Sequence, residues 1–173
     1  MVDQYYDEIN LADELRKAGK TREALDAALR NVARVPDLIR ETTRKCGRFD
    51  LGSIPPIEDG CSLAAILGDE RALNTIASLV EAHKALRPWR EYVATGREDL
   101  AKVALIRQYI DQQPGCIQST LGKMLGIDGR RASGLVSQLD QAGLVERAKQ
   151  GGSYALYPPH AAPEPSSAAS RPL

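Results

Sequence analysis

Two adjacent arginines in the last third of the chain carry the clearest chemical signal in the sequence. Arg130 and Arg131 open the segment RRASGLVSQLDQAGLV, in which small residues follow them. A guanidinium group is well suited to a bidentate contact with guanine or to a forked grip on phosphate. Small neighbours such as Ser133, Gly134 and Ser137 leave a helix surface low enough for close approach to base edges. The segment therefore indicates contact with nucleic acid, and the alternative is that both arginines are solvated surface charges.

A helix predicted over residues 128–142 positions these side chains. Its apolar residues follow the i, i+3, i+4, i+7 spacing of a buried stripe, and they are Ala132, Leu135, Val136 and Leu139. The opposite face then carries Arg130, Gly134, Ser137 and Gln141, flanked by Arg131, Ser133 and Gln138. Asp128 can cap the N-terminus of this helix, and no acidic residue follows it before Asp140.

A shorter helix is predicted just before it, over about Gln118 to Leu125. Leu121 and Leu125 are four residues apart and point at a common core, and Gly122 between them allows close helix contact. Gly126 ends this helix, so a tight turn joins the two helices.

A β-hairpin is predicted over residues 145–157, after Gly143 has terminated the second helix. The chain reverses at Gly151-Gly152. Arg147 and Lys149 are expected near the hairpin tip, where cationic side chains can hold phosphates or enter the minor groove. The alternative is that both residues belong to an ordinary hairpin surface.

The order helix, short strand, helix, turn, helix, hairpin, together with the phrase LDQAGLVER, resembles the winged-helix DNA-binding domains of bacterial MarR-type regulators. The resemblance covers residues 100–157 and implies binding of duplex DNA, usually as a symmetric dimer. The residues that match the recognition helix are Gly129, Arg130, Arg131, Ser133, Gly134 and Ser137. The chain departs from these regulators at its front, where nearly a hundred residues of another helical unit replace short dimerisation helices. The dimer mode and the ligand pocket of the family therefore do not carry over.

The N-terminal part predicts helices joined by short turns. One amphipathic helix runs from Tyr5 to about Ala18. A second begins with Thr21 as its cap, and Pro36 allows a new helix to start after Val35. The pair resembles a tetratricopeptide repeat at Leu11, Ala12, Leu15, Gly19, Ala24 and Pro36. It departs from that motif at Glu8 and Asn31, and a generic helical bundle is the alternative.

The middle of the chain predicts one long loop and three helical segments. The loop runs from Gly47 to Gly60, because Pro55-Pro56 and the glycines disfavour both a helix and a paired strand. Asp69 then caps a helix whose apolar residues are Leu73, Ile76, Ala77, Val80 and Leu86. A short helical piece around Trp89 and Tyr92 follows. A helix from Glu98 to Gln112 is predicted as the first helix of the C-terminal domain.

Charge is distributed unevenly although the chain is neutral overall. Residues 1–99 carry 15 basic and 18 acidic side chains, whereas residues 100–160 carry 7 and 4. The basic excess therefore coincides with the predicted DNA-binding module, and the zero net charge argues against indiscriminate electrostatic binding.

The sequence lacks the motifs that would indicate an enzyme. It contains no HExxH, no GxSxG and no Gly-rich phosphate loop with its lysine, so no catalytic residue and no cofactor is expected. The three cysteines have no CxxC spacing, which favours free thiols over a metal site. With no signal-peptide pattern and no long apolar run, a cytoplasmic location without membrane association is expected.

Together these patterns predict a mainly α protein with a small β-hairpin. A helical-hairpin bundle is expected over residues 1–97, a winged helix-turn-helix domain over 98–158 and a disordered Pro/Ala/Ser-rich tail over 159–173. The leading hypothesis is a transcriptional regulator that binds double-stranded DNA as a homodimer, with its recognition helix at 128–142 and its wing at 145–157. The alternative is a protein–protein scaffold or assembly subunit, in which the N-terminal helices hold a protein partner and the winged helix does not bind DNA.

Overall fold

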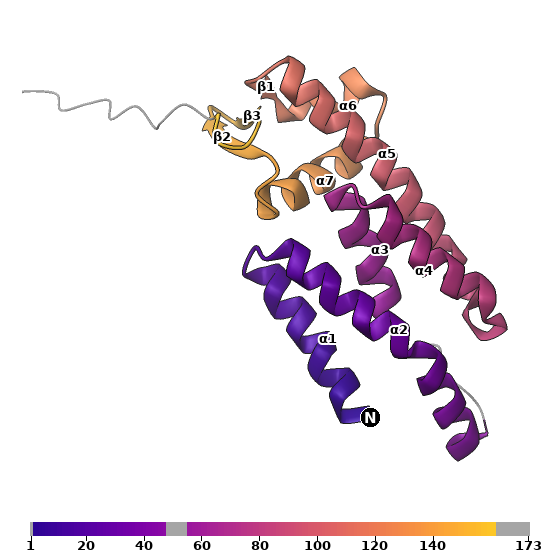
Figure 1. The fold of residues 1–173 in the computed structure, drawn as a ribbon. Coiled ribbons are helices and arrows are strands. Elements are labelled where there is room, and N and C mark those ends of the chain that lie inside the picture. The colour runs from indigo at the N-terminus through magenta and orange to yellow at the C-terminus, as the bar shows by residue number, and fades with distance from the viewer. Residues whose placement is uncertain (1, 48–54, 162–173) are drawn as a thin grey trace, which may run out of the picture. The chain divides into compact units, whose positions relative to one another are not determined.

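A computed structural model describes residues 2–47 and 55–161 of the chain. Over these residues the protein is mainly helical, with one small antiparallel sheet of three strands (Figure 1). This confirms the predicted fold class at that level. The chain divides into two compact units, Met1–Leu105 and Ile106–Leu173. Most of the predicted disordered tail, residues 162–173, lies outside the described residues.

The first unit contains five helical elements and the greater part of a sixth. They are α1 (Val2–Lys17), α2 (Thr21–Cys46), α3 (Pro55–Leu67), α4 (Glu70–Ala82), the 3-10 helix η2 (Lys84–Trp89) and α5 (Arg90–Gln112). One apolar cluster holds them together, with its largest fully buried side chains at Leu25, Ile57, Leu73, Ile76 and Leu86. Burial raises the pKa of the Cys61 thiol to about 12, so Cys61 packs in this cluster as a small apolar group.

Helix α2 continues through Pro36, so the prediction of a new helix start at this residue is wrong. Thr21 is the first helical residue and does not cap α2, because Lys20 occupies the N-cap without a side-chain hydrogen bond. A proline inside a helix removes a single backbone hydrogen bond and costs about 3 kcal/mol. Val32 and Val35 are fully buried in the turn that precedes it, and this packing keeps the helix in one piece.

Helix α3 begins at Pro55, so the predicted loop from Gly47 to Gly60 is wrong for its last six residues. Residues 48–54 of that loop lie outside the described residues. The two prolines occupy the first turn of α3, where a missing backbone N–H is tolerated. Gly60 lies inside the helix because α4 packs close to it, and a Cβ there would stand 2.9 Å from Ile76 Cδ1. Close packing, rather than a turn, explains this glycine.

Asp69 caps helix α4, as the sequence predicted. Its Oδ1 accepts a hydrogen bond of 2.9 Å from the backbone N–H of Ala72, and its other carboxylate oxygen pairs with Arg22 of α2. These contacts hold the pKa of Asp69 below its ordinary value, with the Ala72 bond as the largest cause. The Asp69 carboxylate therefore caps α4 and also connects it to α2 through the ion pair with Arg22.

Replacing Asp69 by alanine should lower the free energy of unfolding by about 1 kcal/mol, because the N-cap is lost. Asp69→Asn is the matched control, since asparagine keeps an acceptor at the cap but cannot form the ion pair. The carboxylate contribution is present above the unfolded pKa of about 3.9 and is lost as the pH falls through the lower folded pKa. Urea unfolding followed by Trp89 fluorescence measures both effects. Equal losses in the alanine and asparagine variants would contradict the cap.

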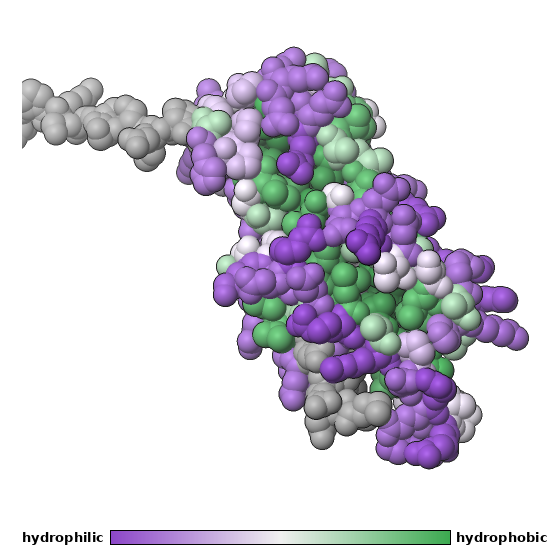
Figure 2. All heavy atoms as spheres, in the orientation of Figure 1, coloured by the Kyte–Doolittle hydropathy of each residue, from purple (hydrophilic) through white to green (hydrophobic). Residues whose placement is uncertain are grey.

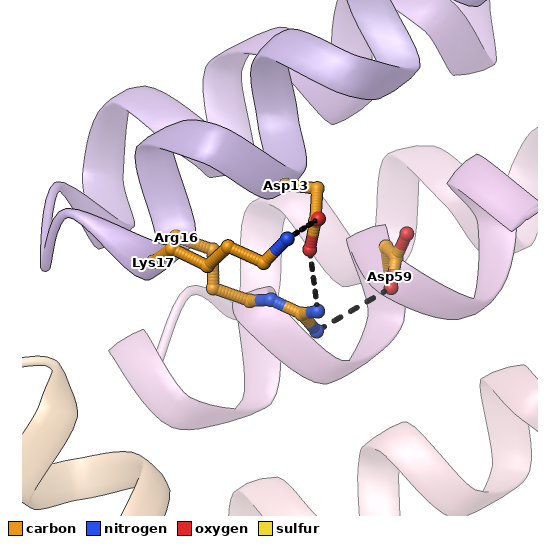
Figure 3. A network of polar contacts seen from close by, with 4 residues as sticks. All are labelled: Asp13, Arg16, Lys17 and Asp59. Carbon is orange, nitrogen blue, oxygen red and sulfur yellow. Dashed lines mark hydrogen bonds and ion pairs between the residues drawn. The ribbon is translucent and has the colours of Figure 1, made fainter.

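Exposed ion pairs connect the end of α1 with α3 (Figure 3). Asp13 lies 2.6 Å from Lys17 and 2.8 Å from Arg16, and these contacts lower its pKa. The guanidinium group of Arg16 also reaches to 3.8 Å from Asp59, whose pKa is raised by partial burial. Exposed pairs of this kind contribute little to stability.

Helix α5 starts eight residues before the predicted Glu98. The helical piece expected around Trp89 is the 3-10 helix η2, which leads directly into α5, and the rings of Trp89 and Tyr92 stack at 5.1 Å. The boundary between the two units falls within α5, after Leu105, whereas the sequence placed the division at residue 97.

The second unit joins the end of α5 to two short helices and the sheet. Its elements are β1 (Cys116–Ile117), α6 (Gln118–Leu125), α7 (Gly129–Gln141), β2 (Glu146–Gln150) and β3 (Ser153–Tyr157). The strand order is β1-β3-β2, and all pairs are antiparallel. Its largest fully buried side chains are Ile106, Ile110, Leu121, Leu135, Leu139 and Leu156. Both short helices and the hairpin lie where the sequence predicted them.

The visible surface of both units is dominated by no single kind of residue. Figure 2 shows hydrophilic residues spread over each unit, with apolar residues in patches among them. Among residues 2–47 and 55–161, no helix combines the length and the apolar character needed to cross a membrane.

Candidate nucleic-acid interface

Helix α7 turns its apolar stripe inward and exposes all the candidate contact residues of its opposite side. Ala132, Leu135, Val136 and Leu139 are at most 2% exposed. The exposed residues are Gly129, Arg130, Arg131, Ser133, Gly134 and Ser137. Asp128 caps the helix as predicted, since its Oδ1 accepts a 2.9 Å hydrogen bond from the backbone N–H of Arg131. The predicted surface of the helix is therefore present, with both arginines in its first turn.

Of the three glycines in helices α6 and α7, packing requires one and does not require the other two. A Cβ on Gly122 of α6 would stand 2.8 Å from the carbonyl oxygen of Ile127 and 3.1 Å from Gly129 Cα. A side chain at that place would push α6 away from the turn and from the start of α7. Around Gly129 and Gly134, in contrast, an added Cβ would meet nothing within 4 Å. Packing does not explain Gly134 in the middle of α7. A glycine at such a position weakens a helix by about 1 kcal/mol relative to alanine.

Arg147 lies well inside the hairpin, so its predicted position near the tip is wrong. It pairs with Leu156, three residue pairs away from the last pair before the turn, Gln150 with Ser153. The side chain is only 20% exposed. Strand register, which depends on the turn and on the partner strand, decides this position.

Three neighbours hold the Arg147 side chain. Its Nε donates to Gln118 Oε1 at 3.1 Å, one terminal nitrogen lies 3.6 Å from Asp140 Oδ2, and the guanidinium group stacks 4.1 Å from the ring centre of Tyr154. These contacts connect β2 with α6, α7 and β3. They make Arg147 a structural link rather than a side chain extended towards a ligand.

Lys149 is the exposed cation of the hairpin. It pairs with Tyr154, one residue pair from the Gly151-Gly152 turn, and its side chain is open to solvent. Cross-strand partners point to the same face of a sheet, so Lys149 shares a face with Arg147 and Tyr154. Of the two cations predicted for the hairpin, Lys149 is therefore the one that is open to solvent.

Gln118 was not singled out by sequence reasoning, yet it joins two of the predicted residues. Its Oε1 accepts from Arg147, and its Nε2 donates to Ser133 Oγ at 2.9 Å. It is the first residue of α6, and nothing in the helical spacing marks it. Only the tertiary arrangement places Ser133 and Arg147 at the two ends of one amide group.

Three of the four acidic residues in the described part of the second unit make contacts within that unit. The four are Asp111, Asp128, Asp140 and Glu146. Asp128 caps α7, Asp140 lies beside Arg147, and Glu146 accepts a 2.6 Å hydrogen bond from the backbone N–H of His160. Within α7 itself the one acidic residue is Asp140, near the end of the helix.

Neither a family model nor a characterised protein matches the chain in sequence, and no solved structure matches its fold. Among the residues that the structure describes, no three His, Cys, Asp or Glu side chains are grouped for a metal ion. Burial raises the pKa of the Cys116 thiol beside α6, which keeps that cysteine protonated.

Proposed function

We propose that the second unit is a winged helix-turn-helix that binds duplex DNA, and that the protein is a sequence-specific transcriptional regulator. In this proposal α7 enters the major groove, and the hairpin of β2 and β3 is the wing that lies along the backbone. The element order and the antiparallel hairpin support this assignment, and they agree with the resemblance to MarR-type regulators.

One observation carries the proposal. The exposed side of α7 combines Arg130 and Arg131 with small residues, and it includes a glycine that the packing of the fold does not require. Arginine is the side chain that most often reads guanine in the major groove. A low helix surface beside the arginines brings the backbone close enough for such contacts.

The first unit is proposed to mediate homodimerisation or to bind a protein partner. Symmetric dimers bind two half-sites about one helical turn apart, so a dimer predicts a palindromic site. A tetratricopeptide-like role for α1 and α2 belongs to the same proposal, as does a location in the cytoplasm.

Selection of bound sequences from a random duplex pool, with the full chain, tests the proposal most directly. A palindromic enriched site is the expected result. If each protomer neutralises about four or five phosphates, the log–log slope of affinity against salt should be on the order of −7 to −9 for a dimer. Failure to enrich any sequence, combined with a stable oligomer by light scattering and a protein captured in the presence of nuclease, would favour the scaffold alternative.

The same binding assay separates backbone contacts from base contacts. Lys149→Ala should weaken binding to all duplexes alike, because a phosphate contact carries no sequence information, and it should reduce the salt slope of a dimer by about 2, one contact for each protomer. Lys84→Ala is the matched control, since Lys84 is an exposed lysine of η2 in the first unit. A loss confined to particular sequences would contradict a phosphate contact by Lys149.

A further inference from the structure

The orientation of the Gln118 side-chain amide is determined by its neighbours. Arg147 Nε can only donate a hydrogen bond, so the group that faces it at 3.1 Å must be the amide oxygen. The amide nitrogen, which can only donate, then faces Ser133 Oγ at 2.9 Å. Ser133 is therefore obliged to accept from Gln118.

The hydroxyl proton of Ser133 is consequently directed elsewhere. Serine and threonine in a helix often donate to the carbonyl four residues earlier, as Thr75 does to Arg71 and Ser78 does to Asn74 in α4, both at 2.9 Å. Among the described residues, the hydrogen bond from Gln118 is the only one that the side chain of Ser133 makes. Since Ser133 is exposed, its O–H remains available to an acceptor outside the protein.

We propose that Gln118 is a positioning residue that makes Ser133 a hydrogen-bond donor towards DNA. This inference rests on the proposed DNA-binding function and identifies the chemistry that Ser133 recognises. The acceptor is either a phosphate oxygen or an acceptor on a base edge, such as guanine N7 or O6, adenine N7 or thymine O4. The amino group of cytosine presents only a donor in the major groove and is disfavoured at this position.

A double-mutant cycle on the full chain tests the role of Gln118. Ser133→Ala should weaken binding to the selected duplex by about 3- to 10-fold, the effect of losing one hydrogen bond. In a Gln118→Met background the same substitution should change affinity by less than about 2-fold, because the released hydroxyl turns back to the carbonyl of Gly129. Ser137→Ala, on the same side of α7, should have the same effect in both backgrounds.

Gln118→Glu provides a second background, in which the result cannot be attributed to loss of the contact with Arg147. Its carboxylate keeps the contact with Arg147 but can only accept, so it draws the Ser133 proton inward. Ser133→Ala should then again have little effect, and thermal unfolding should show that the variant is folded. Comparison with Ser137→Ala in the same background cancels the general effect of the added negative charge.

Sequence selection distinguishes the two sources of the acceptor. A base contact predicts that Ser133→Ala relaxes preference at one position, whereas a phosphate contact predicts a uniform loss over all sequences. Equal effects of Ser133→Ala in all three backgrounds would overturn the inference alone. If the wild-type chain binds no duplex, both the inference and the proposed function are wrong.

Discussion

The Arg130→Ala/Arg131→Ala variant should lose on the order of 30-fold to 20,000-fold in affinity for each half-site of the selected duplex. Each bidentate arginine contact with a base contributes about 1 to 3 kcal/mol, and both arginines stand in the first turn of α7, which enters the groove deepest. Arg130→Ala alone should also remove much of the sequence preference. Fluorescence anisotropy at a fixed salt concentration, with specific and scrambled duplexes, measures both effects.

A second pair of exposed arginines provides the matched control. Arg30→Ala/Arg87→Ala removes the same charge from α2 and η2 of the first unit. It should change affinity by less than about threefold at physiological salt, because the proposed recognition helix and wing include no residue of the first unit and charges outside a contact are largely screened. Equal affinity of the Arg130→Ala/Arg131→Ala variant and the wild type would rule out α7 as a recognition helix.

Gly122→Ala should destabilise the second unit by about 3 kcal/mol. The added methyl group would stand 2.8 Å from the carbonyl oxygen of Ile127, and both neighbouring contacts are backbone atoms, which cannot turn aside as a side chain can. Hydrogen exchange of the backbone amides in α6 and α7, followed by mass spectrometry, measures the loss in this unit separately from the first.

Gly134→Ala is the matched substitution on the neighbouring helix, and it should have the opposite effect on stability. No atom lies within 4 Å of the new methyl group, and alanine favours the helix by about 1 kcal/mol over glycine. Its affinity for DNA should nevertheless fall, because the methyl group raises the surface that approaches the bases. Unchanged exchange in Gly122→Ala would contradict the close packing of α6, and unchanged affinity in Gly134→Ala would show that the low surface is not used.

Sequence reasoning succeeded where the signal is local. The buried stripe of α7, its cap at Asp128 and the cap of α4 at Asp69 follow from spacing and from side-chain acceptors within one turn of helix. It failed where distant packing decides. Pro36 remains inside α2 because buried neighbours support that helix, and α3 continues through Gly60 because α4 packs close to it.

In the candidate site, too, local features could be predicted from the sequence and tertiary contacts could not. The exposed side of α7 could be predicted from its helical period, residue by residue. The position of Arg147 could not, because it depends on the register of β2 with β3. The link through Gln118 could not be predicted either, because residues 118, 133 and 147 meet only when α6, α7 and the hairpin have assembled.

The positive charge on the exposed side of α7 should not depend on pH over the physiological range. The helix contains no histidine, and both histidines of the chain, His83 and His160, lie outside it. Arginine keeps its charge over the physiological range, and histidine is the side chain that ordinarily changes charge between pH 5 and 8. A complex that this helix forms with DNA should therefore persist between pH 5 and 8 and dissociate when the ionic strength rises.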